Sequence, residues 1–216
     1  MRANQLLLKR VAKFGLILIM GVSMSACSDS WKEEVLLHDG SKIIVERKIV
    51  RKGRHELDQR PSFGFQSLMF TMPGAGERVK WEDTYSEELG SASFNPILLA
   101  ILKGKAYVVA TLKGCLSYNK WGRPNPPYVV FRYEDKEWKR ISLQELPAEI
   151  VKPNLIISSP DEEVRKSGES FITAEMIDRM NQGFSQPEYK AILREPLAKE
   201  WCPDTGGPKA PIQPKN

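Results

Sequence analysis

The sequence predicts a mainly β protein with short C-terminal helices, an α+β fold built on an antiparallel sheet of hairpins and arranged as a sandwich or a partly open barrel. Apolar, β-branched segments recur in pairs around short turns, which is typical of hairpins. Helix-capping patterns appear mainly after about residue 143. Hydrophobic residues make up 41% of the 216 residues, enough for a core. We expect one globular domain over residues 31–202, since about 190 residues suit a single domain.

The first predicted hairpin spans residues 31–52. Asp39-Gly40 lies between the apolar residues 35–37 and 43–45, and Gly tolerates the positive φ that a tight hairpin turn needs. Charged residues flank both apolar segments, which indicates a ribbon with one buried face. Four further segments follow: a polar loop at 53–66, a strand at 67–72, a turn at 73–76 and a strand at 78–85.

Residues 96–112 are the most apolar part of the chain after the N-terminal region, and a Gly- and Ser-rich loop at 86–95 precedes them. Their two apolar runs, 97–102 and 106–112, are nearly continuous rather than alternating. Such runs indicate strands covered on both faces. A helix at 97–102 is the alternative that periodicity leaves open.

The stretch 114–127 is rich in Gly and Pro and predicts turns, and a third hairpin follows it. Its strands, 128–133 and 137–143, surround a turn at 134–136. Along the first of them, Tyr128 and Val130 face one side while Val129, Phe131 and Tyr133 face the other, because side chains alternate along a strand.

The C-terminal third predicts short helices. A capping-box spacing begins at Ser142, since Glu145 follows three residues later. Pro at the first helical position and acids in the first turn indicate a helix after Ser159 that Gly168 ends. Thr173 can cap a helix over 174–181. Pro187 opens another short helix through Arg194, and residues 203–216 form a flexible tail.

The N-terminus has the pattern of a secretion signal over residues 1–26. Arg2, Lys9, Arg10 and Lys13 supply positive charge, and no acid precedes Asp29. Residues 14–24 form an uncharged run of eleven residues. A membrane-spanning helix needs about 20 apolar residues, so this run suits a signal better than a permanent span.

The signal ends in Met24-Ser25-Ala26-Cys27, which resembles the lipobox of bacterial lipoproteins, although Met24 stands where Leu is usual. The resemblance implies that Cys27 is acylated and becomes the first residue of the mature protein, followed by a short tether over 27–30. In enterobacterial lipoproteins an Asp after the lipid-bearing Cys retains the protein in the inner membrane. Ser28 follows Cys27 here, so the resemblance implies the outer membrane and a periplasm-facing protein. The alternative is an ordinary signal with a Cys near its end by chance.

Charge gives no argument for a nucleic-acid partner. The signal contains four of the 32 basic residues and no acid, so 28 Lys and Arg face 27 Asp and Glu in the rest of the chain. Nucleic-acid binding needs a clustered basic face, and here the basic residues are spread among acidic residues throughout.

With Cys27 assigned to lipid, Cys115 and Cys202 remain, and an even remainder in an oxidising compartment predicts a disulfide. Two free thiols are the alternative. The two cysteines and two distant histidines do not have the spacing of a zinc site, so we expect no metal and no cofactor.

Catalytic motifs are weak. His38-Asp39 could supply two members of a triad, but a hairpin turn explains the pair as well. The adjacent acids Glu33-Glu34 would point to opposite faces of a strand. Residues 73–76 lack the remainder of a phosphate loop. We therefore predict no catalytic residues.

An aromatic- and Pro-rich stretch beside Cys115 is the candidate partner-binding feature. Exposed aromatic residues on such a loop can form a binding ledge. The residues are Tyr118, Trp121 and Tyr128. The alternative is that Tyr118 and Trp121 pack over the disulfide as local core.

The start of the body, Trp31-Lys32-Glu33-Glu34-Val35-Leu36-Leu37-His38-Asp39-Gly40, together with Gly114-Cys115 and Cys202, resembles a group of uncharacterised proteobacterial lipoproteins. The resemblance covers the first hairpin well and the rest loosely. It implies an envelope location and a β-rich fold, and it implies no activity.

These observations favour a membrane-anchored envelope lipoprotein that is not an enzyme and that binds another macromolecule or has a structural role. The expected partners are membrane lipid, through acylated Cys27, and an envelope protein. A periplasmic immunity or inhibitor lipoprotein is the alternative, and an envelope hydrolase is a third hypothesis.

Overall fold

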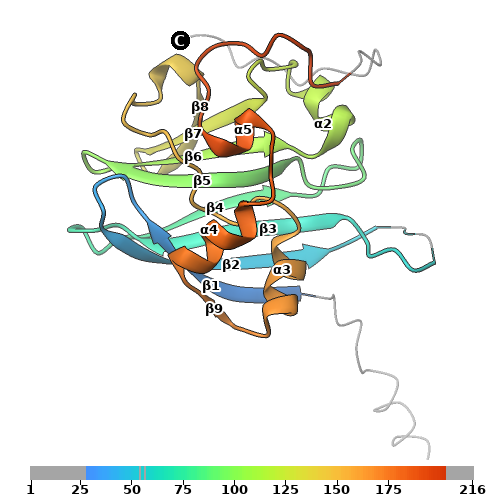
Figure 1. Ribbon diagram of the computed structural model, residues 1–216, viewed down its shortest axis with the longest axis horizontal. Coiled ribbons are helices and arrows are strands. Elements are labelled where there is room, and N and C mark those ends of the chain that lie inside the picture. Colours follow the sequence, from blue (N-terminus) through green and yellow to red (C-terminus); the bar gives the residue numbers. More distant parts are fainter. Residues whose placement is uncertain (1–27, 54, 56, 203–216) are drawn as a thin grey trace, which may run out of the picture.

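A computed structural model describes residues 28–53, 55 and 57–202, and it contains two sheets packed face to face (Figure 1). The first sheet has the strand order β4-β3-β2-β1-β9, and the second has the order β5-β6-β7-β8. Neighbouring strands are antiparallel except β9, which runs parallel to β1. The predicted mainly β, α+β fold is confirmed, and the sheets form a sandwich without closing into a barrel. The strands are β1 (Ser28–Leu36), β2 (Lys42–Arg51), β3 (Phe63–Thr71), β4 (Arg78–Thr84), β5 (Phe94–Leu102), β6 (Lys105–Leu112), β7 (Tyr128–Glu134), β8 (Glu137–Ile141) and β9 (Phe171–Ile172).

The first hairpin forms as predicted. Gly40 has a φ of 84°, and the Leu37 amide donates to the Ser41 carbonyl at 2.8 Å, which closes the turn. The prediction of a tether over 27–30 is wrong for its described residues, because β1 begins at Ser28 and Ser28 pairs with Val50. Backbone pairing with β2 extends through residues 28–30. Their side chains are polar and do not alternate with apolar ones, so no sequence pattern indicated a strand there.

The predicted loop over 53–66 ends earlier than expected, because β3 begins at Phe63. Gly64 suggested a break in structure, yet it lies within the strand. A Cβ at Gly64 would lie 2.3 Å from the Cβ of Lys52, so the close approach of two backbones requires glycine there. Val50 pairs with Phe65 and Arg51 pairs with Phe63, so Gly64 is an extra residue in β3. Glycine is often found at such β-bulges.

The apolar stretch at 97–112 forms two strands of the second sheet, and the helical alternative at 97–102 is excluded. The hairpin of β7 and β8 also forms, with positive φ at Asp135 and Lys136 in the turn. The turn-rich interpretation of 114–127 is wrong in part, because α2 (Gly114–Lys120) occupies its beginning. Helix α2 has no side-chain cap, and tertiary contacts hold it: the Ser117 hydroxyl donates to the Ser93 carbonyl at 2.7 Å.

One apolar layer joins the two sheets. Alternate residues of every strand from β1 to β7 contribute to it, which is the period-two pattern expected of half-buried strands. Aromatic rings fill its centre, with the Trp81 and Phe131 centroids 5.7 Å apart. The principal members are Val35, Val45, Leu68, Phe70, Val79, Trp81, Phe94, Leu99, Val108, Leu112 and Val129.

The C-terminal third covers the outer face of the second sheet and one side of the sandwich. Its helices are the 3-10 turn η1 (Leu143–Glu145), α3 (Pro160–Ser167), α4 (Ala174–Asn181) and α5 (Pro187–Lys190). In Figure 1, α3, α4 and α5 all lie in front of the strands. The capping box at Ser142 and the Thr173 cap are confirmed, whereas α5 ends at Lys190 rather than Arg194. A second apolar cluster forms beneath this segment: Ile97, Leu98, Tyr107, Val109, Tyr128, Val130, Leu146, Ile150, Ile157 and Ile192.

A disulfide between Cys115 and Cys202 joins α2 to the last described residue, as predicted; the two Cα atoms are 5.5 Å apart. Arg123 holds the same segment, because its guanidinium donates to the Cys202 carbonyl at 2.7 Å and to Asn119 at 2.6 Å. The end of the described chain at residues 200–202 is therefore tied to α2 and to the turn after it by one covalent bond and several polar contacts.

We expect the double variant Cys115→Ser/Cys202→Ser to lose about 4 kcal/mol of unfolding free energy, because the disulfide closes a loop of 87 residues. For a domain of this size the loss corresponds to a melting temperature roughly 8–16 °C lower. Thermal unfolding followed by circular dichroism measures it. Reductant should lower the melting temperature of the wild type and leave that of the double variant unchanged; equal melting temperatures without reductant would contradict the prediction.

Candidate functional site

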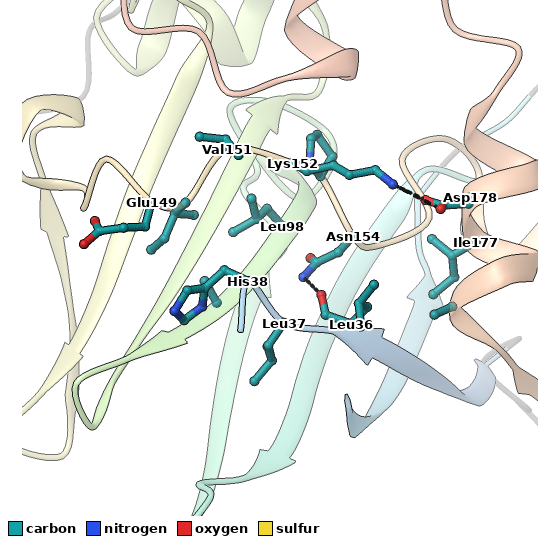
Figure 2. Close-up of a pocket in the computed structure, with 14 residues that line it drawn as sticks. Leu36, Leu37, His38, Leu98, Glu149, Val151, Lys152, Asn154, Ile177 and Asp178 are labelled. Carbon is teal, nitrogen blue, oxygen red and sulfur yellow. Dashed lines mark hydrogen bonds and ion pairs between the residues drawn. The ribbon is translucent and has the colours of Figure 1, made fainter. Parts of the chain in front are cut away.

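A partly enclosed hollow with chemically diverse walls lies beside the turn of the first hairpin, and we call it the intersheet pocket. Its cavity of about 260 Å³ is bounded by the end of β1, by β5, by residues 149–154 and by α4 (Figure 2). Its walls are mainly apolar, and charged residues stand on the rim. The apolar lining comprises Leu36, Leu37, Leu98, Ala100, Ile150, Val151, Pro153, Ala174 and Ile177.

Asn154 holds the two sheets together at this pocket. Its amide nitrogen donates to the Leu36 carbonyl on β1 at 2.9 Å and to the Leu99 carbonyl on β5 at 2.8 Å. Its Oδ1 accepts from the Leu99 amide at 2.9 Å. One side chain thus satisfies backbone groups of both sheets, as buried polar groups require. Figure 2 shows the bond from Asn154 to Leu36 at the mouth of the pocket.

Polar side chains stand in two groups on opposite sides of the pocket (Figure 2). On one side the Lys152 ammonium lies 2.9 and 3.0 Å from the two carboxylate oxygens of Asp178. This pair is exposed, so it contributes little to stability. On the other side are His38, at the end of the first hairpin, and Glu149.

The size and lining of the intersheet pocket suit a side chain better than a substrate molecule. Sites for small molecules usually enclose about 300–1,000 Å³, and this cavity lies just below that range. An apolar floor with both signs of charge at its rim resembles the depressions in which protein partners place an anchoring residue.

The predicted aromatic ledge does not form, because the structure buries Tyr118 and Tyr128 and partly buries Trp121. Tyr118 is 1% exposed and its ring lies 5.5 Å from that of Trp201, beside the disulfide. Trp121 is partly buried, and its ring lies 4.6 Å from that of Phe94. The alternative that these rings pack as local core is therefore confirmed. The physical reason is that Tyr118 on α2 and Trp121 directly after this helix both pack against the apolar layer between the sheets.

Tyr128 is also buried, and its hydroxyl has a structural partner. It donates to the Glu188 carbonyl at 2.8 Å and accepts from the Leu193 amide at 3.4 Å. Burial raises the pKa of this phenol. Tyr128 thus holds the segment around α5 against the second sheet, and it lies outside the intersheet pocket.

The weak catalytic candidates have structural explanations. Asp39 accepts from the Ser41 amide at 3.0 Å and from its hydroxyl at 2.6 Å, and these bonds lower the pKa of its carboxyl. The His38-Asp39 pair is therefore part of a turn. Glu33 is buried and bonds Arg47 at 2.9 Å, whereas Glu34 is on the opposite face and bonds Lys42, as the alternation along a strand predicts.

A buried charged cluster lies at one end of the sandwich, on the side opposite the first hairpin turn. Lys113 Nζ is 3.3 Å from the centre of the Phe63 ring. Burial, followed by the nearby Arg51, lowers the pKa of Lys113 to about 8, although Asp161 and Asp83 oppose the shift. Arg51 in turn donates to both carboxylate oxygens of Asp161 at 2.8 and 3.0 Å. A lysine with a low pKa can act as a nucleophile, but here Phe63 lies against the ammonium group.

Several sequence predictions lie outside the described residues: the signal over 1–26, Cys27 and the tail over 203–216. Within the described ranges, no helix is both long and apolar enough to cross a membrane. The same residues contain no group of three or more His, Cys, Asp or Glu side chains placed to hold a metal ion. Comparison of the chain with known protein families, with curated proteins and with solved structures gave no match.

Replacing Asn154 with Leu should lower the unfolding free energy by about 3 kcal/mol, because backbone groups of Leu36 and Leu99 would lose their partners. Urea unfolding measures the change. Asn154→Asp keeps the acceptor oxygen and loses the amide donors. Its unfolding free energy should fall between those of the wild type and of Asn154→Leu. A Leu variant as stable as the wild type would show that Asn154 does not join the sheets.

Lys113 predicts a pH dependence of stability. The folded chain releases its proton near pH 8, whereas the unfolded chain keeps it to about pH 10.5, so the unfolded state binds more protons in between and stability rises with pH. We expect a gain of about 2 kcal/mol from pH 8 to 10. Above pH 10 the raised pKa of Tyr128 acts in the opposite direction. Urea midpoints of the wild type should increase over this window, and those of Lys113→Met should not.

Proposed function

We propose that the chain is the precursor of a bacterial envelope lipoprotein, acylated at Cys27 after removal of residues 1–26, whose body binds another envelope macromolecule and is not an enzyme. The Cys115–Cys202 disulfide is the observation that carries the location. Disulfides form and persist outside the cytoplasm and are rare within it. The lipobox-like sequence and the resemblance of the first hairpin to proteobacterial lipoproteins support the same assignment.

The start of β1 supports an anchor that holds the body close to the membrane. Ser28, the first residue of the strand, is bonded directly to Cys27, and Ser28, Asp29 and Ser30 pair with β2. A lipid on Cys27 would therefore attach to the sheet without a flexible linker. A protein held this close to the membrane can contact only molecules that lie at or near the membrane surface. This position favours binding to other envelope components.

The intersheet pocket supports a binding role. Its mouth is formed by an exposed hairpin end and by the exposed pair of Lys152 and Asp178, so a partner can approach it without displacing core residues. An apolar side chain would fill the pocket, and the oppositely charged rim would orient the partner through polar contacts. An immunity or inhibitor lipoprotein would be one form of such a binding protein.

The Cys27→Ala variant tests the anchor. We expect wild-type protein made in a Gram-negative bacterium to fractionate with membranes and to have an intact mass that starts at an acylated Cys27. The variant should lack the acyl mass and lose membrane association. The matched control, Ser28→Ala, should remain acylated and membrane-bound.

Density separation of the membranes should place the wild-type protein with the outer membrane, because Ser28 follows Cys27. An intact Met1 in the mature protein, or a free sulfur at position 27 in membrane-bound material, would refute the lipoprotein assignment.

A further inference from the structure

The outward side of the first sheet is not covered by any other described element except at one corner, where α4 contacts Glu34 and Lys42, and we call it the open face. The helices of the C-terminal third contact inward-facing residues of the sheet, such as Trp31 and Ile49. The strand register arranges the open face in rows that cross the sheet. Starting from the row nearest Cys27, these are Ser28, Val50, Phe65 and Thr84; then Ser30, Lys48, Ser67 and Glu82; then Phe171, Lys32, Glu46, Met69 and Lys80; and then Glu34, Ile44, Thr71 and Arg78.

Positive charge remains on this face after its ion pairs are assigned. Lys32 and Lys48 are exposed diagonal neighbours on β1 and β2, and within the described part of the chain neither has an anionic partner. Every acid on the face is already paired with another cation. Those pairs are Arg78 with Glu46, Lys80 with Glu82, and Lys42 with Glu34. The two free ammonium groups therefore give the open face a surplus of two positive charges.

A shallow hollow of about 650 Å³ lies between these lysines. Lys32, Lys48 and Lys80 line it together with Ser30 and Ser67. Its lining also includes Glu46, which pairs with Arg78, and the apolar side chains of Phe65, Met69 and Phe171. Ser67 is only 7% exposed, and its hydroxyl has no hydrogen-bond partner among the described residues. The Ser67 hydroxyl and the nearby ammonium groups are donors of the kind that an anionic oxygen requires.

Apolar side chains are also exposed on the same face. Phe171 on β9 is 40% exposed, and Ile44 and Leu36 are slightly more so. These are three of the six large apolar side chains exposed among residues 28–53, 55 and 57–202. Phe65 lies in the row nearest Cys27 and is partly exposed. Mixed basic and apolar side chains on one surface are typical of surfaces that lie at a membrane interface.

We propose that the open face lies flat against the membrane in which Cys27 is anchored, and that Lys32 and Lys48 bind the phosphates of anionic lipid headgroups. This inference rests on the proposed acylation of Cys27. Lys48 pairs with Ser30, about 7 Å along the strand from Ser28, and Lys32 is about 13 Å along it. The headgroup layer is only about 5–8 Å deep, so an upright strand would leave Lys32 in water. A sheet lying flat would bring both lysines into contact with lipid.

Amine acetylation of the lipidated protein, read by mass spectrometry of its peptides, tests the inference. The purified protein is inserted into vesicles of phosphatidylcholine with or without anionic phosphatidylglycerol. We expect Lys32 and Lys48 to react about fivefold more slowly when phosphatidylglycerol is present, which is the effect of one lysine near an anionic surface. High salt should remove the difference. Lys103 and Lys136, exposed at the turns of the second sheet, should react equally in both.

A pair of double variants sharpens the test. Lys32→Gln/Lys48→Gln should abolish the phosphatidylglycerol-dependent protection of Lys80, which stands at the edge of the same hollow. Lys103→Gln/Lys136→Gln removes the same charge from the other sheet and should leave that protection intact. All four lysines are exposed, so neither variant should alter folding.

Each other outcome overturns the inference. Equal labelling of Lys32 in both vesicles would mean that the open face does not lie on lipid. Protection by dissolved inorganic phosphate alone would indicate a soluble anion as the ligand, and protection that grows with protein concentration in detergent would indicate a second copy of this chain. The intact mass of the same sample separates the two proposals. Acylated Cys27 without protection refutes only this inference, whereas unmodified Cys27 refutes both.

Discussion

The architecture depends on one constraint, which is that two sheets have four faces and the chain covers three of them. The inner faces cover each other through the apolar layer around Trp81 and Val108. The C-terminal third covers the outer face of the second sheet, whose strands are consequently apolar on both sides. Apart from the corner that α4 contacts, no described element lies on the outer face of the first sheet. On β4 the side chains accordingly alternate between buried Val79 and Trp81 and exposed Arg78, Lys80 and Glu82. The side chains on each face of a sheet thus indicate whether another part of the chain packs against that face.

Polar contacts hold the covering segment in place at three positions. Asn154 joins it to both sheets, Arg51 binds Asp161 at the start of α3, and Arg123 with the disulfide holds residues 200–202. Each contact satisfies buried backbone or charged groups, and so it specifies one position for a segment that has little secondary structure. The apolar residues of that segment supply burial area, while these polar groups decide where the segment binds.

Local signals predicted the three hairpins, because a turn and its two strands are encoded within a few residues. Asp39-Gly40 and the alternation along β7 are examples. The sequence did not reveal α2, since its residues have weak helix propensity and the helix depends on Ser93 and Cys202. Nor could it reveal the intersheet pocket. Asn154 contacts Leu36 across 118 residues and Leu99 across 55, and no local pattern encodes such partners. The aromatic residues that suggested a binding ledge proved to be core for the same reason.

The positions of the anchor and the pocket along β1 bear on how the two proposed interactions coexist. Cys27 adjoins the first residue of the strand, and the intersheet pocket begins at its last, Leu36. Eight steps of extended chain separate them by about 27 Å. A sheet lying flat on the membrane would therefore keep the pocket well away from the acyl chains, at the edge of the protein footprint. Of the open-face residues the pocket shares only Leu36, and Lys32 and Lys48 do not line it. A partner that approaches past Lys152 and Asp178 would leave these two lysines to lipid, so membrane contact and partner binding would not compete.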